Sequence, residues 1–561
     1  MKKTCALLLS IALLLGTAAA FAAKYDPAVV ALDGSLPIVK DPSQFEPFKI
    51  VNNVSWNMFR DMSELTMSIK ITEETGIPIE WIGIPDAGYE EKVNLMLASR
   101  DLPDMFYKGI REETITQYSG QDVFLPTEDL IEKYVPRLVE IFKMRPEYAA
   151  LTLYGDGHRY GFPYIEEMYG LTLTPGPFII NKNWLDQVGL DVPQTLNEFK
   201  EALLAFRDAG DLNGNGEADE IPYANNFVVT RDIFDTGNSF FTLMACFGEG
   251  VSYGSYYGYC KLDANKEKVV FPILNDAFFD ALHFYNELNA EGLLDMDGFA
   301  GDGSFTYKMR QDDAILGAFS TWAPTNDIPV KSVYEQYVPL PRLDGPKGKM
   351  GIACNRSEVW GISQCVITTA CKYPEILAAM INYMNEPEMA ITVNWGAIDE
   401  VYYRREDGVL GFHLDENGYF VLPEGEGFET FDDVRRNSTP QQGGVVVLND
   451  YYDTVAEYTY DARDLLAWQR ANGKIDVLAE DTPLPPFMMT PDEQMTYSQI
   501  YPQIENIIRA YMVSSIMDGG IDENRESFEK QLYDAGLEEM LALVQSAYDR
   551  FLVTYNEYAN K

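Results

Sequence analysis

Short apolar runs alternate with amphipathic segments in the first part of the chain. Residues 48–54 and 77–85 are apolar runs of strand length, and residues 62–76 between them have helical spacing and end at a glycine. A strand, a helix and a second strand at this spacing predict a βαβ unit in a largely parallel sheet. Residues 89–109 then predict another amphipathic helix and a short strand that ends near Asp104.

The same patterns continue toward the carboxyl terminus. A helix is predicted from Leu196, because Thr195 and Glu198 have the spacing of a capping box, which satisfies free backbone donors at a helix start. The patterns also predict a helix at 276–295, a strand and turn at 314–324, a Pro- and Gly-rich connection between lobes at 337–349 and a helical tail at 491–557.

The amino-terminal segment has the pattern of a cleaved secretory signal. Lys2 and Lys3 precede an apolar run from Cys5 to Leu15, and small residues lead to a cleavage site after Ala22. The run is shorter than the roughly 20 apolar residues of a membrane-spanning helix. Cys5 follows the basic residues directly, which is a poor position for a lipid-modified cysteine. We therefore expect an exported protein, periplasmic or extracellular, without a lipid anchor.

Composition and charge restrict the class of protein further. The chain has 561 residues, 46% of them hydrophobic, enough for two or three domains. A formal net charge of −44 disfavours nucleic acid, polyanions and anionic membranes as partners and is easier to reconcile with a neutral or cationic small ligand. Outside the signal, the cysteines are odd in number and lack CxxC spacing, so internal disulfides and buried thiols both remain open: Cys246, Cys260, Cys354, Cys365 and Cys371.

Several blocks of sequence, in this order, resemble the extracellular solute-binding proteins of carbohydrate ABC importers (family 1), including alginate- and oligosaccharide-binding members. The blocks are "EEKVNLMLASRDLPDMFY", "INKNWLDQVGLDVPQTLNEFKEALLAF", "DLNGNGEADEIP", "ALHFYNELNAEGLLD", "YVPLPRLDGPKGK" and "LVQSAYDRF". The resemblance implies an α/β protein with the two-lobed periplasmic-binding-protein fold of type II. In that fold, discontinuous lobes are joined by hinge crossovers and close over the ligand.

The resemblance also implies a division of the chain and a set of partners. After the signal peptide at 1–22, the first lobe is expected to comprise 45–165 and 350–390, and the second 166–349 and 391–561. The expected function is that of an exported subunit that captures an oligosaccharide and delivers it to the membrane permease of an ABC importer. A monomer is expected.

An acidic loop at 211–222, "DLNGNGEADEIP", has the pattern of a calcium site. Asp211, Asn213 and Asn215 stand at alternate positions and Gly216 permits a sharp turn, as in an EF-hand. The twelfth position is Pro222, where an EF-hand has a bidentate glutamate. An Asn-Gly turn without metal is the alternative.

The resembling binding proteins close this kind of loop with an adjacent acidic pair, which here corresponds to Asp219 and Glu220. The resemblance also implies that Glu217 contributes its backbone carbonyl. We therefore expect a structural Ca²⁺, because hard oxygen ligands without an evident open position hold a metal rather than activate water.

No convincing catalytic pattern accompanies these features. The histidines, His158, His283 and His413, lack the spacing of a zinc site. Residues 250–254 fit GxSxG, but they lie in a Gly- and Tyr-rich stretch and not between a strand and a helix. We expect no enzyme. A secreted glycoside hydrolase remains the alternative, because paired carboxylates cannot be excluded among 87 acidic residues.

Aromatic residues beside polar ones, near predicted strand ends, are the candidates for sugar binding. Aromatic faces cover the apolar surface of a pyranose, and polar side chains pair with its hydroxyl groups. Asp104 is the preferred carboxylate, because ligands of α/β proteins collect at the carboxyl ends of strands. Packing in the core is the alternative for each aromatic residue, and it is preferred for Trp184 and Trp468. The candidates are Trp56, Asp104, Tyr164, Glu166, Trp322, Trp360, Trp395 and Tyr402.

Overall fold

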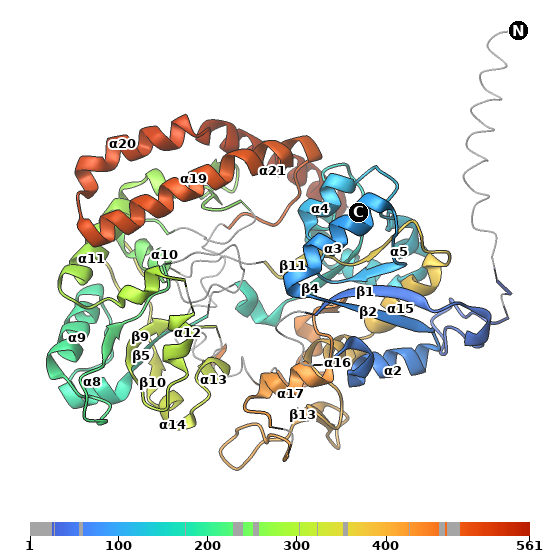
Figure 1. The fold of residues 1–561 in the computed structure, drawn as a ribbon, viewed down its shortest axis with the longest axis horizontal. Helices are drawn as coiled ribbons and strands as arrows, with labels where there is room; N and C mark the ends of the chain where they lie inside the picture. The colour runs from blue at the N-terminus through green and yellow to red at the C-terminus, as the bar shows by residue number, and fades with distance from the viewer. Residues whose placement is uncertain are drawn as a thin grey trace, which may run out of the picture.

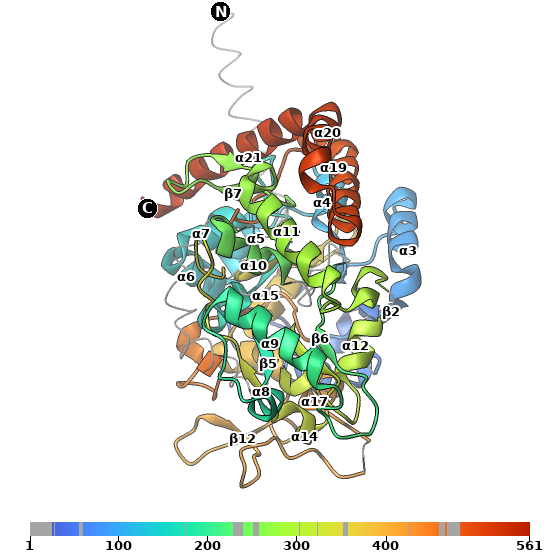
Figure 2. The same cartoon turned by 90° about the vertical axis from the view of Figure 1, so that its left-hand side faces the viewer.

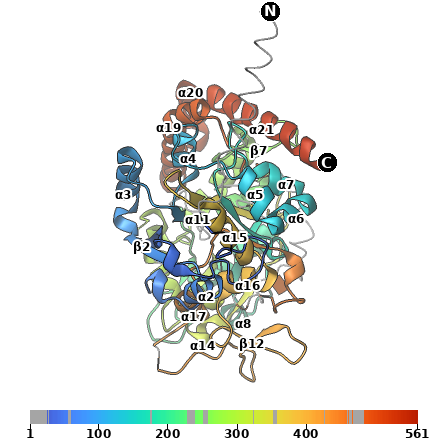
Figure 3. The same ribbon diagram turned by 90° about the vertical axis from the view of Figure 1, so that its right-hand side faces the viewer.

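The chain folds into two α/β lobes that lie side by side (Figure 1). The structure, a computed structural model, describes residues 25–560 except 27, 55–59, 174–175, 228–238, 251–256, 302, 323, 352–356, 426, 459, 461–465 and 468–482. Each lobe has its own sheet and its own hydrophobic core. Figures 2 and 3 view the second and the first lobe from their outer sides. The predicted two-lobed α/β architecture is confirmed.

The first lobe contains a six-stranded sheet in the order β14-β4-β11-β3-β1-β2. All of its strands are parallel except β11. The strands are β1 (Phe48–Val54), β2 (Ile79–Pro85), β3 (Met105–Tyr107), β4 (Phe162–Glu166), β11 (Val359–Ile367) and β14 (Val446–Val447). The predicted βαβ unit is confirmed as β1, α2 (Thr66–Thr75) and β2. Gly76 ends α2 at φ 67°, where an added Cβ would lie 2.1 Å from the carbonyl oxygen of Val39.

Helices cover both faces of this sheet, and a small hairpin extends from it. The helices are α3 (Asp86–Ser99), α4 (Glu112–Tyr118), α5 (Glu128–Tyr134), α6 (Pro136–Met144), α7 (Pro146–Leu151), α15 (Pro374–Met384), α16 (Pro387–Trp395) and α17 (Phe431–Ser438). The hairpin strands are β12 (Tyr402–Arg404) and β13 (Leu410–Phe412), and the 3-10 turns are Pro42–Gln44, Met62–Glu64, Met168–Leu173 and Asn449–Tyr451.

The second lobe contains a four-stranded sheet in the order β10-β5-β9-β6. The strands are β5 (Phe178–Asn181), β6 (Ile221–Tyr223), β9 (Leu316–Ser320) and β10 (Tyr337–Pro339). Residues of β5 alternate between two cores, because Phe178 and Ile180 belong to one and Ile179 to the other. Both faces of the sheet are therefore covered.

The helices of the second lobe are α8 (Lys182–Val188), α9 (Leu196–Ala209), α10 (Phe240–Met244), α11 (Asp276–Ala290), α12 (Ser304–Met309), α13 (Pro324–Asp327) and α14 (Lys331–Tyr334). A short ladder joins β7 (Lys261–Leu262) to β8 (Val269–Val270), and the 3-10 turns are Ala245–Phe247, Pro272–Leu274 and Met296–Phe299. The predicted capping box is present at the start of α9, where Thr195 accepts from the backbone of Glu198 and Glu198 caps in return. Trp184 is fully buried on α8, as predicted.

Long helices at the carboxyl terminus connect the two lobes. They are α19 (Pro491–Asp518), α20 (Ile521–Asp534) and α21 (Leu537–Ala559), which confirm the predicted helical tail. Their buried residues belong to the core of the second lobe, but α21 continues across to α7 of the first lobe (Figure 1). At the end of α21 the hydroxyl of Tyr558 accepts from Arg159 of the first lobe at 3.1 Å.

The division of the chain differs from the prediction in two places. Residues 391–466 were expected in the second lobe, but their buried side chains, from Ile391 to Leu466, belong to the core of the first. Residues 337–349 were expected to connect lobes, but they contribute β10 and a turn that packs against Cys246 within the second lobe. The chain returns to the first lobe only after residue 351.

Four of the cysteines, Cys246, Cys260, Cys365 and Cys371, are buried free thiols, and Cys354 lies outside the described residues. The signal segment, Trp56, Trp468 and most of the GxSxG stretch also lie outside them. In the described part of the chain, no helix has both the length and the apolar composition needed to cross a bilayer.

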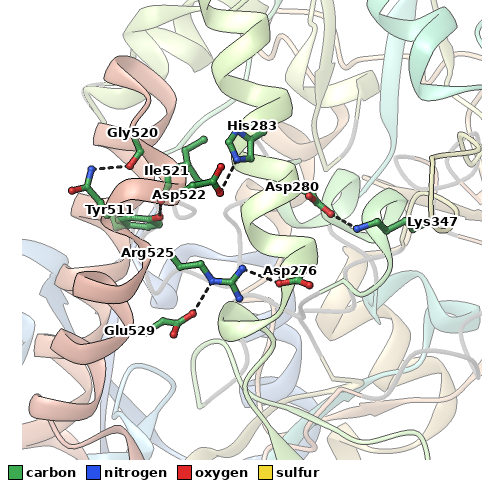
Figure 4. A network of polar contacts seen from close by, with 11 residues as sticks. Asp276, Asp280, His283, Lys347, Tyr511, Gly520, Ile521, Asp522, Arg525 and Glu529 are labelled. Carbon is green, nitrogen blue, oxygen red and sulfur yellow. Dashed lines mark hydrogen bonds and ion pairs between the residues drawn. The ribbon is translucent and has the colours of Figure 1, made fainter.

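Polar contacts attach α20 to α11, and Lys347 of the turn after β10 also contacts α11, at Asp280 (Figure 4). The guanidinium of Arg525 on α20 donates to Asp276 and to Glu529, each at 2.8 Å, and lies 3.9 Å from the ring centre of the buried Phe279. On the same helix Asp522 contacts His283, with 3.2 Å between the atoms. Arg525 therefore combines packing with charge pairing at this joint.

We expect Arg525→Ala to lower the free energy of unfolding by about 1 kcal/mol, because it removes both the cation–π contact and the covering of Phe279. Lys530→Ala on the same helix is the control. Its pair with Asp534 is exposed on both sides and should change stability by less than roughly 0.5 kcal/mol. Urea unfolding of both variants checks this. Equal stability of the two variants would contradict the assigned role of Arg525.

Candidate ligand-binding site

One edge of the first sheet and one edge of the second sheet face each other across the two lobes. In the first lobe, the carboxyl ends of the parallel strands and the amino end of β11 share one edge. In the second lobe, β9 ends at Ser320 and leads directly to Trp322. Ligands of α/β proteins collect at such edges. Candidate ligand contacts should therefore be sought where Trp322 approaches β11.

A row of aromatic side chains crosses from one lobe to the other at this point. The ring of Trp322, from the second lobe, is 6.3 Å from that of Trp360, at the start of β11. Trp360 is in turn 6.1 Å from Tyr164 on β4. Both tryptophans are half-buried, whereas Tyr164 is buried. The structure thus brings together three residues that the sequence had identified separately.

Beneath this row, Glu166 is the centre of a buried polar network. Its carboxylate accepts from the hydroxyl of Tyr452 at 2.6 Å and from the amide nitrogen of Asn394 at 2.5 Å. The hydroxyl of Tyr164 donates to the amide oxygen of Asn394 at 3.1 Å. Glu166 itself is completely buried. The network therefore holds the base of the aromatic row in a fixed position.

Trp395 belongs to this network and not to the aromatic row. Its indole nitrogen donates to Tyr452 at 3.0 Å, and the guanidinium of Arg435 lies 3.8 Å from its ring centre. Only 3% of Trp395 is exposed. One face of its ring is thus already occupied by a cation, so Trp395 supports the site from below.

The environment of Glu166 favours its neutral form. Burial raises the pKa of Glu166 to about 8, although the hydrogen bond from Tyr452 and the nearby charge of Arg435 lower it. The adjacent Glu167 adds to the rise. Glu166 therefore carries a proton through much of the neutral pH range.

Glu167 lies where β4 leads out of the first lobe. Its carboxylate accepts from Arg145 at 2.8 Å, from the hydroxyl of Tyr148 at 3.0 Å and from the backbone nitrogen of Asn449 at 2.7 Å. Tyr148 also lies 2.5 Å from a carboxylate oxygen of Glu358, the residue before β11. β4 leaves the first lobe here and β11 returns to it, so these contacts lie where the chain passes between the lobes.

Two further sequence candidates lie elsewhere. Asp104 was expected at the carboxyl end of a strand, but β3 begins after it. Its carboxylate accepts from the backbone of Lys49 near the start of β1, which is the opposite edge of the sheet. Tyr402 is completely buried in the first core, where its ring lies 4.7 Å from that of Phe412. The structure does not bring either residue to the aromatic row.

Two polar residues that the sequence patterns did not identify lie near the carboxyl end of β3, at the edge of the sheet that carries the aromatic row. Lys108 follows β3 directly, is buried, and donates to the carbonyl oxygen of Pro440 at 2.9 Å. Burial lowers the pKa of Lys108 to about 8. Glu112 follows four residues later, and burial together with the charge of Glu113 raises its pKa to about 7. Ending the predicted strand at Tyr107 instead of Asp104 would have identified both residues.

The loop at 440–444 was also missed. Gln441 is 4% exposed, and its amide nitrogen has no hydrogen-bond partner among the described residues. Gln441 and Gln442 both have left-handed backbone angles, with φ values of 53° and 47°. Such conformations cost energy for residues other than glycine and concentrate at functional sites. The left-handed angles of Gln441 and Gln442 therefore mark the "QQGG" loop as a candidate functional segment.

The acidic loop after α9 folds around its own side chains. The carboxylate of Asp211 accepts from the backbone nitrogens of Gly214 and Gly216 at 2.7 and 2.9 Å. Asn213 and Asn215 each accept from a backbone nitrogen two residues later. The side-chain oxygens of Asp211, Asn213 and Asn215 are thus all engaged by backbone nitrogens of the loop itself.

Acidic residues close the other side of the loop. Asp219 accepts from the amide groups of Asn213 and Asn215 at 3.1 to 3.3 Å. One oxygen of Glu220 accepts from the backbone nitrogens of Leu212 and Asn213. The other oxygen of Glu220 is buried and has no hydrogen-bond partner in the described structure. A buried carboxylate oxygen without a partner is costly, and a cation would satisfy it.

No catalytic constellation is visible in the described residues. His158 contacts Glu128, His283 contacts Asp522 and His413 packs against Tyr403, all in separate places. Across the same residues, no group of three or more His, Cys, Asp or Glu side chains is arranged to hold a metal ion. The loop after α9 differs from such a group because it combines carboxylates with the side-chain oxygens of Asn213 and Asn215.

Comparison with known proteins places the chain among transport proteins. It matches the family of bacterial extracellular solute-binding proteins over residues 67–391. It is 29% identical over 508 residues, covering 89% of both chains, to the fructooligosaccharide ABC transporter substrate-binding protein FusA of Streptococcus pneumoniae. It is 24% identical over 505 residues to lipoprotein LipO of Bacillus subtilis, covering 86% of this chain and 90% of that one.

Solved structures of FusA have the same fold. FusA in complex with kestose superposes with a TM-score of 0.75 at 28% identity, covering 92% of this chain and 100% of that one. An EF-hand mutant of FusA in complex with fructo-nystose gives a TM-score of 0.74 with the same identity and coverage.

The chain therefore belongs to the family of bacterial extracellular solute-binding proteins. Its fold is the two-lobed type II fold of these proteins, as predicted. The expectation of a binding protein and not an enzyme is also confirmed, because the matched relatives include a transporter substrate-binding protein. The alternative of a glycoside hydrolase finds no support.

The proton on Glu166 predicts a pH-dependent stability. From about pH 5 to about pH 8 the folded protein retains a proton that unfolded glutamate has lost, so stability falls as pH rises, by at most roughly 1.4 kcal/mol per pH unit for this group. Glu166→Gln should remove this slope and leave the contributions of other groups. Thermal melting across this range checks it, with the exposed Glu64→Gln as control. Parallel profiles for Glu166→Gln and the parent would show that Glu166 is ionised when folded.

Proposed function

We propose that this chain captures an oligosaccharide between its lobes and delivers it to the membrane permease of an ABC importer. The observation that carries the proposal is the aromatic row of Trp322, Trp360 and Tyr164. It is shared by the facing edges of both sheets. Rings from both lobes would cover the apolar surface of sugar units, and hinge closure would bury them.

Polar groups around the row suit the hydroxyl groups of a sugar. Glu112 offers a carboxylate, Lys108 an ammonium and Gln441 an amide nitrogen that lacks a partner in the described structure. Lys108 and Glu112 follow β3, and Gln441 comes directly after Pro440, whose carbonyl oxygen accepts from Lys108. Polar groups of these kinds can form hydrogen bonds with sugar hydroxyl groups, which supports reversible binding.

The relatives narrow the ligand class. FusA is described as a fructooligosaccharide-binding protein and has been solved with kestose and fructo-nystose. Its similarity covers most of both chains, so short fructooligosaccharides are the first ligands to test. We also propose that the chain is exported after cleavage of residues 1–22, that it has no lipid anchor and that it is a monomer. The matched family is extracellular, which supports export.

We also propose that the loop at 211–222 holds a structural Ca²⁺. Asp211, Asn213, Asn215, Asp219 and Glu220 would supply side-chain oxygens, and Glu217 its backbone carbonyl. The oxygen of Glu220 without a partner supports this, as does the EF-hand of the relative FusA. Calcium would hold the loop closed between α9 and β6. It would have no contact with the sugar.

Replacing a tryptophan of the row should weaken sugar binding. We expect Trp322→Ala and Trp360→Ala each to raise the Kd for kestose by more than about fivefold, because aromatic platforms buried on binding act as hot spots. Trp184→Phe, in the core of the second lobe, is the control and should leave affinity unchanged. Calorimetric titration measures Kd, and chromatography of the recovered sugar should show it intact. Normal affinity in both row variants would exclude this site.

Removing calcium should lower stability but not affinity. We expect chelation to lower the Tm of the parent, because a ligand bound only by the folded state stabilises it by mass action. Glu220→Gln combined with Asp219→Asn should abolish the effect of chelator. Glu217→Gln is the control, since only its backbone is a proposed ligand. If chelation prevents sugar binding while the protein stays folded, calcium belongs to the sugar site instead.

A further inference from the structure

Residues 414–420 form a second hairpin of the first lobe, which follows β13 and is closed by a bridge between Leu414 and Phe420. Asp415 accepts from the backbone nitrogens of Asn417 and Tyr419 at 2.8 and 2.9 Å. Gly418 takes the left-handed conformation, with φ 83°, that closes such a turn. The sequence "DENGY" therefore fixes the direction in which Tyr419 leaves the turn.

The base of the hairpin is anchored in the first lobe. Phe420 is buried, and its ring lies 5.0 Å from that of Phe431 on α17. Tyr460 and Phe412 complete this aromatic cluster. The turn thus extends from a packed core and moves with the first lobe.

Tyr419 contacts the second lobe. Its hydroxyl donates to Glu335 at 2.9 Å, and its ring centre lies 3.7 Å from the ammonium of Lys331 on α14. It also packs against the core cluster that contains Ile179 and Phe319. In Figure 1, α14 and β13 are both found at the lower side of the molecule. Tyr419 therefore makes a cation–π contact, a hydrogen bond and an apolar contact with the second lobe.

This contact is separate from the hinge and from the aromatic row. Tyr419 and Lys331 belong to different lobes, and neither lies on a segment that passes between them. A contact of this kind breaks when the lobes separate, whereas contacts at the hinge persist. It therefore favours the closed arrangement over any open one.

We propose that the hairpin at 414–420 is a latch, in which Tyr419 holds the lobes closed over the ligand without touching it. The effect on ligand release rests on the proposed function. A cation–π contact and a hydrogen bond at a partly exposed position correspond to about a three- to tenfold change in the closed population. Because the latch acts after capture, the change should fall on the dissociation rate more than on association.

The first test needs no ligand. Spin labels at Leu95 on α3 and Tyr307 on α12, which are 68% and 70% exposed on opposite lobes, report lobe separation by pulsed EPR. Tyr419→Ala should shift and broaden the distance distribution. Tyr419→Phe should give an intermediate result, because it keeps the ring over Lys331. Val421→Ala, at an exposed position directly after the hairpin, should match the parent. An unchanged distribution in Tyr419→Ala overturns the latch.

The second test measures release of kestose by stopped-flow tryptophan fluorescence. Tyr419→Ala should release it about three- to tenfold faster, with a similar association rate and Tm. Lys331→Met should have part of this effect and should add little to Tyr419→Ala. Unchanged release in Tyr419→Ala would overturn the latch even if the EPR distances shift. If no variant, nor the parent, binds kestose, that ligand is wrong, and the EPR result alone decides the latch.

Discussion

A buried carboxylate fixes the point at which the chain leaves the first lobe. Glu167 follows β4, where the chain leaves the first lobe, and it binds Arg145, Tyr148 and the backbone after β14. A buried carboxylate is tolerated only when several donors surround it, so its position and theirs are fixed together. Glu167 is thereby held against Arg145, Tyr148 and the segment after β14, all of the first lobe, at the place where the chain continues toward the second lobe.

The candidate site lies beside this point for a topological reason. β4 ends and β11 begins at the edge of the sheet that faces the second lobe, so Glu166, Trp360 and the hinge are neighbours. Glu166 fixes Tyr164 through Asn394, and Tyr164 in turn contacts Trp360. A ligand that contacts the row would therefore lie close to the segments that pass between the lobes.

Local rules in the sequence predicted local features correctly. The capping box at Thr195 depends on neighbours within a few residues, and the βαβ unit depends on segments that follow one another along the chain; both are present. The strand near Asp104 was displaced by a few residues, and that error exchanged one edge of the sheet for the other. Periodicity also could not distinguish Trp395, covered by Arg435, from an exposed platform. The packing of residues 391–466 on the first lobe joins segments far apart in sequence, for which no local pattern exists.

Contacts within a lobe and contacts between lobes contribute to different equilibria. The hydrogen bonds among Glu166, Tyr452, Asn394 and Tyr164 all lie within the first lobe, so they stabilise the fold of that lobe. Only contacts that differ between the open and closed arrangements change their ratio. Trp322 with Trp360, near the hinge, and Tyr419 with Lys331, away from it, are contacts of this kind. Each is weak compared with the buried network, and weak contacts are what the proposed function requires, because under that proposal closure has to reverse on delivery.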